Sequence, residues 1–259
     1  MPAFTPAAEL CRDFHAAVLA PALNGIPYAA GLLGPGSDVL GFDTDRSTDH
    51  DWGPRANIFV AAGQVEAATA RIEAALPQTY RGWSLRIGRD GRFAPHQVTV
   101  GVWPEWLADQ LGLDPAGELS PADWLVIPQQ RLLEVVAGPV FADPGGVLAA
   151  ARSRLASYPN DVWWWLLACQ WRRIAQEEAF VQRTAEVGDQ LGSAVVAARL
   201  VRDAIRLALL IARRYAPYTK WLGTAFARLP QLDGLDRQLA ALLAAADPAA
   251  RQQAQTAAY

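Results

Sequence analysis

The pattern of apolar residues changes at residues 143–146 (Asp-Pro-Gly-Gly), and this change most constrains what the chain can fold into. Before it, short apolar runs alternate with segments of helical periodicity, which is typical of a mixed α/β domain. After it, every periodic segment has helical spacing. We therefore predict an α+β chain with two domains, a mixed α/β domain over residues 1–144 and an all-α helical domain over residues 145–259.

The individual elements follow from the same periodicities and from the turn residues between them. Asp90-Gly91 predicts a hairpin turn between the last two of the expected strands. Strands are expected at residues 29–33, 49–60, 83–88 and 93–102. Helices are expected at residues 6–23, 64–76, 103–111, 121–127, 128–137, 147–157, 161–187, 193–215, 220–229 and 235–246.

Charge is distributed unevenly between the two predicted domains. Residues 1–144 carry 9 Lys/Arg and 17 Asp/Glu, a balance of −8, and the remainder carries 14 and 9, a balance of +5. The asymmetry fits an acidic, metal-holding half and a basic, phosphate-holding half, and it also fits two domains with differently solvated surfaces. The chain is net acidic and lacks a dense basic patch, so we predict no nucleic-acid partner.

Cysteine usage and the apolar runs bear on the cellular compartment. Cys11 and Cys169 are the only cysteines, and they give neither a disulfide framework nor zinc-site spacing. Residues 1–5 contain no basic segment leading into an apolar one, which argues against a signal peptide. The most apolar run, residues 162–171, is too short to span a bilayer. We predict a cytoplasmic protein with no membrane partner.

The chemistry concentrates in residues 36–54, which contain five aspartates. If Asp49 and Asp51 lie on the expected strand, their side chains point to one face and His50 points to the other. Two such carboxylates can share Mg²⁺, which prefers oxygen ligands and completes its shell with water and phosphate oxygens. A lone Asp-x-Asp is also common at polar strand ends and turns.

A glycine–serine step precedes the two aspartates. Gly36 allows the backbone to approach a phosphate closely, and Ser37 adds an amide and a hydroxyl facing the same ligand. Together with the aspartates, this step predicts a nucleoside triphosphate site, in which the metal activates an acceptor hydroxyl and orients the leaving pyrophosphate. The remaining aspartates are interpreted as loop and capping residues: Asp38, Asp43 and Asp45.

Gly36-Ser37 followed by Asp49-His50-Asp51 resembles the signature of the nucleotidyltransferase superfamily that includes DNA polymerase beta and the aminoglycoside nucleotidyltransferases. Residues 36–54, 158–163 and 215–223 resemble, more closely, the family called domain of unknown function 4037. The resemblance implies a nucleotidyltransferase-like domain followed by a helical domain that continues beyond Tyr259. It does not imply a substrate. One departure is that neither later strand candidate contains the third carboxylate usual in the superfamily, which leaves Asp90 or Glu134 as candidates.

In the helical half, Lys220 is the only lysine of the chain. Related nucleotidyltransferases commonly contact the triphosphate with a basic residue of the helical domain, so Lys220 is our candidate. Four arginines share one helical face, which is either a solvated surface or the wall of an anion site: Arg199, Arg202, Arg206 and Arg213. Three consecutive tryptophans, Trp163 to Trp165, cover so much of a helix circumference that at least one should lie off the core.

The sequence thus predicts a Mg²⁺-dependent nucleotidyltransferase. In it, Asp49 and Asp51 hold the metal, and Gly36, Ser37 and Lys220 bind a nucleoside triphosphate such as ATP. The acceptor is a hydroxyl of a small molecule or a protein. The alternatives are a nucleotide-binding regulatory protein of the same fold with weak or no catalysis, and a partner-binding helical protein with a vestigial α/β domain.

Overall fold

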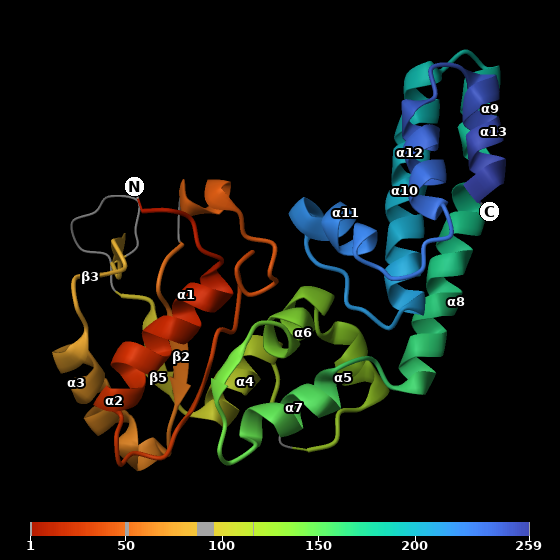
Figure 1. Cartoon of the computed structure of the whole chain (residues 1–259). Coiled ribbons are helices and arrows are strands. Elements are labelled where there is room, and N and C mark those ends of the chain that lie inside the picture. The colour runs from red at the N-terminus through yellow and green to blue at the C-terminus, as the bar shows by residue number, and fades with distance from the viewer. Residues whose placement is uncertain (1, 50–51, 87–95, 116, 259) are drawn as a thin grey trace. The chain divides into compact units, whose positions relative to one another are not determined.

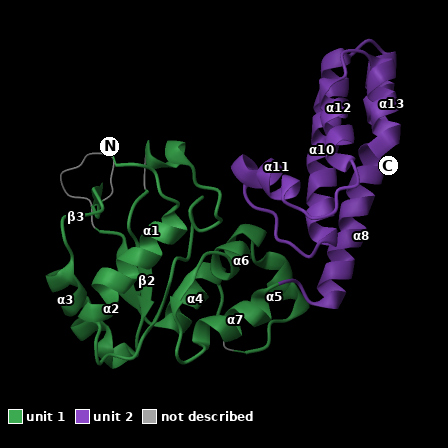
Figure 2. Cartoon of the chain, viewed as in Figure 1, with its two compact units in different colours: residues 1–156 green, residues 157–259 purple. Residues whose placement is uncertain are grey.

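The computed structural model describes residues 2–49, 52–86, 96–115 and 117–258, and everything below refers to them. The chain forms two compact units, one ending at Ala156 and the other beginning at Ser157 (Figure 2). The first contains all the described strands together with helices, and the second contains only helices (Figure 1). The predicted α+β class is therefore confirmed. The contacts group residues 147–155 with the first unit, whereas the sequence analysis began the helical domain at residue 145.

A four-stranded mixed sheet lies in the first unit. Its strands are β1 (Ala29–Gly31), β2 (Ala56–Phe59), β5 (Val98–Gly101) and β6 (Val140–Ala142), in the order β5-β2-β1-β6. β1 runs antiparallel to β2 and β6, while β2 and β5 are parallel. Parallel neighbours need a crossover connection, and helix α3 (Val65–Ala75) lies within it.

The strand predictions hold to different degrees. β1 and β5 fall inside the expected segments 29–33 and 93–102. β4 (Trp83–Ser84) pairs with the short β3 (Thr79–Tyr80), and Arg86 forms an antiparallel bridge with His96, as a hairpin requires. The predicted Asp90-Gly91 turn lies outside the described residues.

Helices of the first unit begin and end close to the expected residues. They are α1 (Ala7–Phe14), a π-helical turn (His15–Leu19), α2 (Ala20–Ala22), α3, α4 (Trp103–Leu111), α5 (Pro121–Val126), α6 (Gln129–Val136) and α7 (Val147–Leu155). Local residues explain several ends: Ser120 and Asp123 form a capping box before α5, and Gly112 closes α4 in the left-handed conformation. The core packs the first helices and α3 on the sheet through residues such as Phe14, Leu19, Ile58 and Ile72.

The second unit is built from α8 (Asn160–Glu177), α9 (Phe180–Glu186), α10 (Gln190–Ile211), α11 (Thr219–Ala227), α12 (Leu235–Ala244) and α13 (Pro248–Ala258). The predicted single helix 161–187 is wrong, because the chain interrupts it between Glu177 and Phe180. Trp164 and Trp165 are exposed, which confirms that not all three consecutive tryptophans reach the core. Over the described chain, none of the helices is both long and apolar enough to cross a membrane.

Arg152 on α7 fastens the end of α6. Its guanidinium donates to three carbonyl groups at that end, at 3.1 Å to Val135 O, 2.6 Å to Ala137 O and 2.9 Å to Gly138 O. The last carbonyls of a helix lack partners within the helix, so this one side chain supplies them. Burial lowers the pKa of Arg152, and the nearby Asp143 carboxylate acts in the opposite direction.

Replacing Arg152 by alanine should lower the free energy of unfolding by about 3 kcal/mol, because the carbonyl groups lose charge-assisted hydrogen bonds. Arg154, on the same helix, donates to one acceptor among the described residues, Pro115 O at 2.8 Å, and is the matched control. Arg154→Ala should cost less than about 1 kcal/mol. Urea unfolding followed by tryptophan fluorescence measures both, and equal losses would contradict the role given to Arg152.

His15 introduces a pH dependence of stability. Its ring is buried, its Nε2 lies 3.0 Å from Tyr28 Oη, and it stacks on Phe141. Burial lowers the pKa of His15 below its ordinary value, so the folded state favours the neutral ring. The stabilisation is complete above the unfolded pKa of about 6.5 and is lost as the pH falls through the lowered folded value.

The free energy of unfolding should therefore fall between pH 7.5 and pH 5 partly because of this one group. His15→Phe removes the titrating ring but keeps an aromatic side chain against Phe141. In urea titrations at the two pH values, the variant should lose less stability than the unmodified chain. If the two chains lose the same amount, His15 does not contribute to the pH dependence.

Candidate active site

The predicted chemistry falls on the long connection between β1 and β2, residues 32–55. Near its start, Gly36 has a φ of 136°, a conformation that favours glycine. A Cβ atom at this position would lie 2.0 Å from Asp38 Oδ1 and 2.8 Å from Arg55 Nη2. The turn at Gly36-Ser37 thus requires glycine for its backbone conformation and for the approach of two charged side chains.

Those two side chains form a buried ion pair that closes the connection. Arg55 Nε lies 2.6 Å from Asp38 Oδ2, and Arg55 Nη2 lies 2.9 Å from Asp38 Oδ1. The same Nη2 donates to Pro35 O at 2.9 Å. The Asp38 side chain is 5% exposed and the Arg55 side chain is 14% exposed. Their bidentate contact fixes the Gly36-Ser37 turn to Arg55, the residue just before β2.

Asp43 fixes the middle of the connection. Its Oδ2 accepts from the backbone amide of Ala7, at 2.7 Å, and from Trp52 Nε1, at 3.0 Å. The first contact satisfies an amide in the first turn of α1, so Asp43 joins the connection to that helix and not only to its own turn. The second holds the indole that directly follows residues 50–51, and this indole packs edge-on against Trp83.

Asp49 is the last residue of a 3₁₀ helix, η2 (Asp45–Asp49), and not part of a strand. The expected strand 49–60 is therefore wrong at Asp49 and at residues 52–55, since β2 begins only at Ala56. Two local hydrogen bonds favour the helical turn: Thr44 N donates to Ser47 Oγ and Thr48 Oγ1 to Asp45 O.

Since Asp49 is not on a strand, strand alternation no longer predicts that the carboxylates of Asp49 and Asp51 share one face. Asp49 has a side chain that is 44% exposed and lies 3.3 Å from Arg46 Nε. Asp51 and His50 lie outside the described residues. Among the residues that are described, no group of three His, Cys, Asp or Glu side chains is arranged to hold a metal ion.

A third carboxylate is absent from the described residues of the neighbouring strand. β5, residues Val98–Gly101, carries Thr99 opposite Asn57 of β2. Asn57 donates from Nδ2 to Thr99 Oγ1 at 3.1 Å and accepts from Leu33 N at 3.0 Å. Asn57 on β2 therefore joins β5, through Thr99, to the segment that follows β1, through Leu33. This role could not be predicted from the sequence, because only tertiary pairing brings these residues together.

Of the two other candidates for this acid, Asp90 lies outside the described residues, and Glu134 is engaged elsewhere. Glu134 is buried on α6, where one oxygen accepts from Gln110 Nε2 and the other from Gln130 Nε2. Arg131 Nη1 lies 3.6 Å away. The carboxylate thus belongs to a polar network between α4 and α6. The backbone of Glu134 does reach the site, because its carbonyl accepts from Gly34 N at 3.0 Å.

Lys220 belongs to the second unit, in the first turn of α11. Its Nζ lies 5.1 Å from the centre of the Trp221 ring, and the side chain is exposed. Gly36, Ser37 and Asp49 belong to the first unit. The assignment of Lys220 to the triphosphate stays a prediction.

Residues 158–163 and 215–223, which carried part of the resemblance, meet in one corner of the second unit. Tyr158 and Tyr215 pack edge to face at 5.1 Å, and Arg213 lies 4.0 Å above the Trp163 ring. Trp163 Nε1 also donates to Leu210 O at 2.7 Å. Burial raises the pKa of Tyr215 well above its ordinary value. These contacts explain Tyr158, Trp163 and Tyr215 as packing residues that join α8 to the end of α10.

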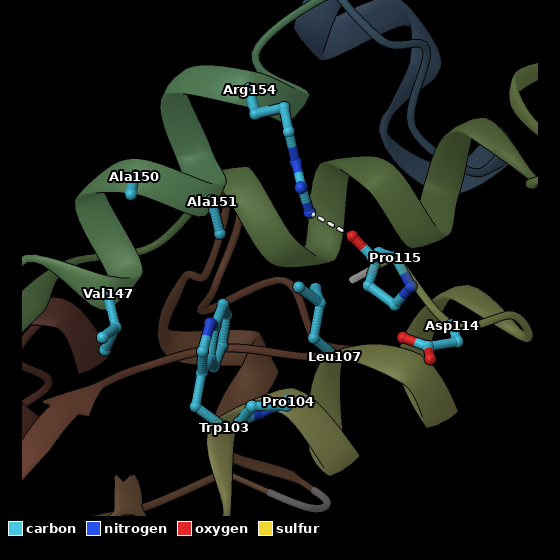
Figure 3. A pocket seen from close by; sticks show the side chains of 9 residues that line it. All are labelled: Trp103, Pro104, Leu107, Asp114, Pro115, Val147, Ala150, Ala151 and Arg154. Atoms are coloured by element: carbon cyan, nitrogen blue, oxygen red, sulfur yellow. Dashed lines mark hydrogen bonds between the residues drawn. The ribbon is translucent and has the colours of Figure 1, made fainter. Parts of the chain in front are cut away.

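A separate hollow of about 420 Å³ lies between α4 and α7 (Figure 3). Its wall is mainly apolar, with Asp114 and Arg154 at its rim, and Arg154 donates to Pro115 O as drawn. Gly36, Ser37 and Asp49 do not line it. The chemistry proposed from the sequence therefore concerns the connection between β1 and β2 and not this hollow.

Comparison with known proteins gives one family match. The model of the family described as Domain of unknown function (DUF4037) matches residues 124–222, which confirms the resemblance over that part of the chain. The matched part includes the corner around Tyr158 and Tyr215 but not residues 36–54. No curated protein sequence matches the chain.

A solved structure is also similar, at a low level. It is a nucleotidyltransferase-like protein from Exiguobacterium sibiricum 255-15, with 9% sequence identity and a TM-score of 0.39. The similarity covers 96% of this chain and 74% of that one.

Proposed function

We propose that this chain is a Mg²⁺-dependent nucleotidyltransferase, which transfers a nucleoside monophosphate from a nucleoside triphosphate to a hydroxyl group. The observation that supports this most is the bracing of the connection between β1 and β2. Asp38 and Arg55 hold the Gly36-Ser37 turn. Asp43 holds Trp52, which follows Asp51 in the chain. A site whose supporting shell is fixed before ligand arrives spends less binding energy on ordering.

The donor set fits a hard divalent cation in chemical type. Carboxylate oxygens are preferred ligands of Mg²⁺, and the exposed side chain of Asp49 is accessible to one. Asp49 and Asp51 would hold the ion, which supplies charge neutralisation on the phosphate oxygens when bound. Gly36 and Ser37 would bind the β- and γ-phosphates, and Lys220 would add a positive charge.

The proposed reaction is a single in-line displacement. The acceptor hydroxyl oxygen forms a bond to the α-phosphorus, the bond from that phosphorus to the bridging oxygen breaks, and pyrophosphate leaves with its electron pair. The hydroxyl proton passes to water or to a nearby carboxylate. The residues of the Gly36-Ser37 turn orient the triphosphate so that the leaving group lies opposite the attacking oxygen.

A second function, nucleotide binding without turnover, is favoured by a specific observation. The described β5 residue next to the site is Thr99, and the Glu134 carboxylate is taken up by Gln110 and Gln130. Without a base within reach of the acceptor proton, transfer would be slow.

One experiment tests both functions. The chain is incubated with Mg²⁺ and each of the four ribonucleoside triphosphates, labelled on the α-phosphate, with and without candidate acceptors including the chain itself. Transfer predicts pyrophosphate release and a labelled acceptor, both dependent on Mg²⁺. Binding without release, measured by calorimetry, indicates the regulatory function. No binding of any triphosphate with Mg²⁺ present would contradict both.

A further inference from the structure

Arg199, Arg202 and Arg206 lie on α10, but Arg213 lies beyond its last residue, Ile211, with a φ of 53°, so the predicted helical face does not extend to Arg213. Arg199 and Arg213 have partners. Arg199 Nη2 pairs with Glu177 of α8 at 2.9 Å, and Arg213 belongs to the corner around Trp163. Arg202 and Arg206 remain, and within the described part of the chain neither forms an ion pair with a carboxylate within 4.0 Å. Two neighbouring guanidinium groups without counter-ions distinguish this part of the helix from an ordinary salt-bridged surface.

The surroundings of Arg206 contain polar atoms whose hydrogen-bonding capacity is unused. Arg206 Nε is buried and has no acceptor, and Oδ1 of the 2% exposed Asp203 has no hydrogen-bond donor. The cation closest to that oxygen in the described ion pairs is Arg173 of α8, at 3.9 Å. Buried donors and acceptors are normally satisfied, and leaving one unsatisfied costs roughly 1–3 kcal/mol.

The local charge is positive. Burial lowers the pKa of Arg206, the cations Arg202 and Arg173 lower it further, and only the Asp203 carboxylate opposes them. Three guanidinium groups therefore lie within electrostatic range of one carboxylate, which leaves about two positive charges without compensation. Gln170 of α8 donates to Asp203 O at 2.9 Å, so the two helices that carry these groups are held in register.

The structure assigns Arg202 and Arg206, together with Arg173, to a binding site for a phosphate group on the α8–α10 face. A phosphate dianion matches the uncompensated charge, and its oxygens can accept from several guanidinium groups at once. This site is separate from the triphosphate site proposed at Gly36-Ser37, and it needs no metal ion.

The phosphate could arrive free or on a phosphorylated molecule, and the test includes both. The Asp49→Asn variant of this 259-residue chain, without Mg²⁺, is titrated by calorimetry with inorganic phosphate and with a phosphomonoester, at constant ionic strength. Removing Asp49 and the metal weakens the proposed transfer site, and the arginine substitutions below distinguish binding at α8 and α10 from any binding that remains at Gly36-Ser37. Binding of both probes indicates that the phosphate group alone is recognised, and binding of only one identifies the source.

Arg202→Gln and Arg206→Gln should each weaken binding about 10- to 100-fold, as expected for loss of a charge-assisted hydrogen bond. Arg206→Lys should be intermediate, because it keeps the charge but loses the planar donor group. Arg183→Gln, an exposed arginine of α9, is the control and should bind like the parent.

If Arg206→Gln fails to fold, the affinity of Arg202→Gln alone tests the phosphate site, because Arg202 is exposed. Equal affinity in the parent and in Arg202→Gln would overturn the site. The absence of phosphate binding to the parent, or equally strong binding of chloride at the same ionic strength, would overturn it as well.

Discussion

Replacing Arg55 by alanine is expected to lower the free energy of unfolding by about 3–5 kcal/mol, because it strands a buried carboxylate. Asp38 is 5% exposed, and its two oxygens are held by Arg55 at 2.6 and 2.9 Å. Without the guanidinium, that charge has no described partner of opposite sign, and Pro35 O loses its donor as well. Urea unfolding followed by tryptophan fluorescence measures the loss, with Trp52 and Trp83 reporting on the same part of the first unit.

The chain offers a matched control for this prediction. Arg46 pairs with Asp49 at 3.3 Å, but its side chain is 90% exposed, so Arg46→Ala should cost less than about 0.5 kcal/mol. Arg55→Lys keeps the charge, loses the bidentate geometry and should fall between the two. A loss for Arg55→Ala no larger than for Arg46→Ala would show that the pair does not brace the connection.

The same substitution separates stability from function. If the pair positions Gly36 and Ser37, Arg55→Lys should bind the triphosphate more weakly than the parent chain, even at a temperature at which the variant remains folded. Replacing both partners with residues of similar size, Asp38→Leu with Arg55→Met, should restore much of the stability, since no charge is left buried. It should not restore binding. Recovery of both properties in the double variant would contradict a positioning role for the pair.

Much of the fold could be predicted because local signals agree with it. Helix α4 was expected at residues 103–111 and is found there, since Pro104 favours its first turn and Gly112 ends it. β6 was not predicted, because three residues between Pro139 and Asp143 give too short a pattern. Its existence depends on pairing with β1, which is a tertiary event.

The candidate site could be predicted only in part, and for a related reason. The types and spacing of Gly36, Ser37 and Asp49 are visible in the sequence. The partner of Asp38 is not, since Arg55 lies 17 residues further along and only the closed connection brings the two together. The 3₁₀ helix before residue 50 was not predicted either. Side-chain hydrogen bonds of Ser47 and Thr48 favour it, and the periodicity of apolar residues contains no information about such bonds.

Asp49→Asn is expected to lower nucleotidyl transfer at least about 100-fold, which corresponds to roughly 3 kcal/mol of lost transition-state stabilisation. The amide keeps the shape of the side chain but removes the charge that a divalent cation needs. Stability should hardly change, because Asp49 is 44% exposed and its pair with Arg46 is a surface contact. Asp51→Asn should have the same effect on transfer if both carboxylates share one ion.

The control for Asp49→Asn is Asp45→Asn, an exposed aspartate at the other end of the same 3₁₀ helix. It changes the charge of the connection by the same amount, so it reports the purely electrostatic part of the effect. The decisive measurement is calorimetry of triphosphate binding with and without Mg²⁺. Asp49→Asn should abolish the Mg²⁺-dependent part of the affinity, and Asp45→Asn should leave it within about threefold, the scale of a single screened surface charge. Equal effects of the two substitutions would mean that Asp49 contributes only general negative charge, and the metal site would then have to lie elsewhere.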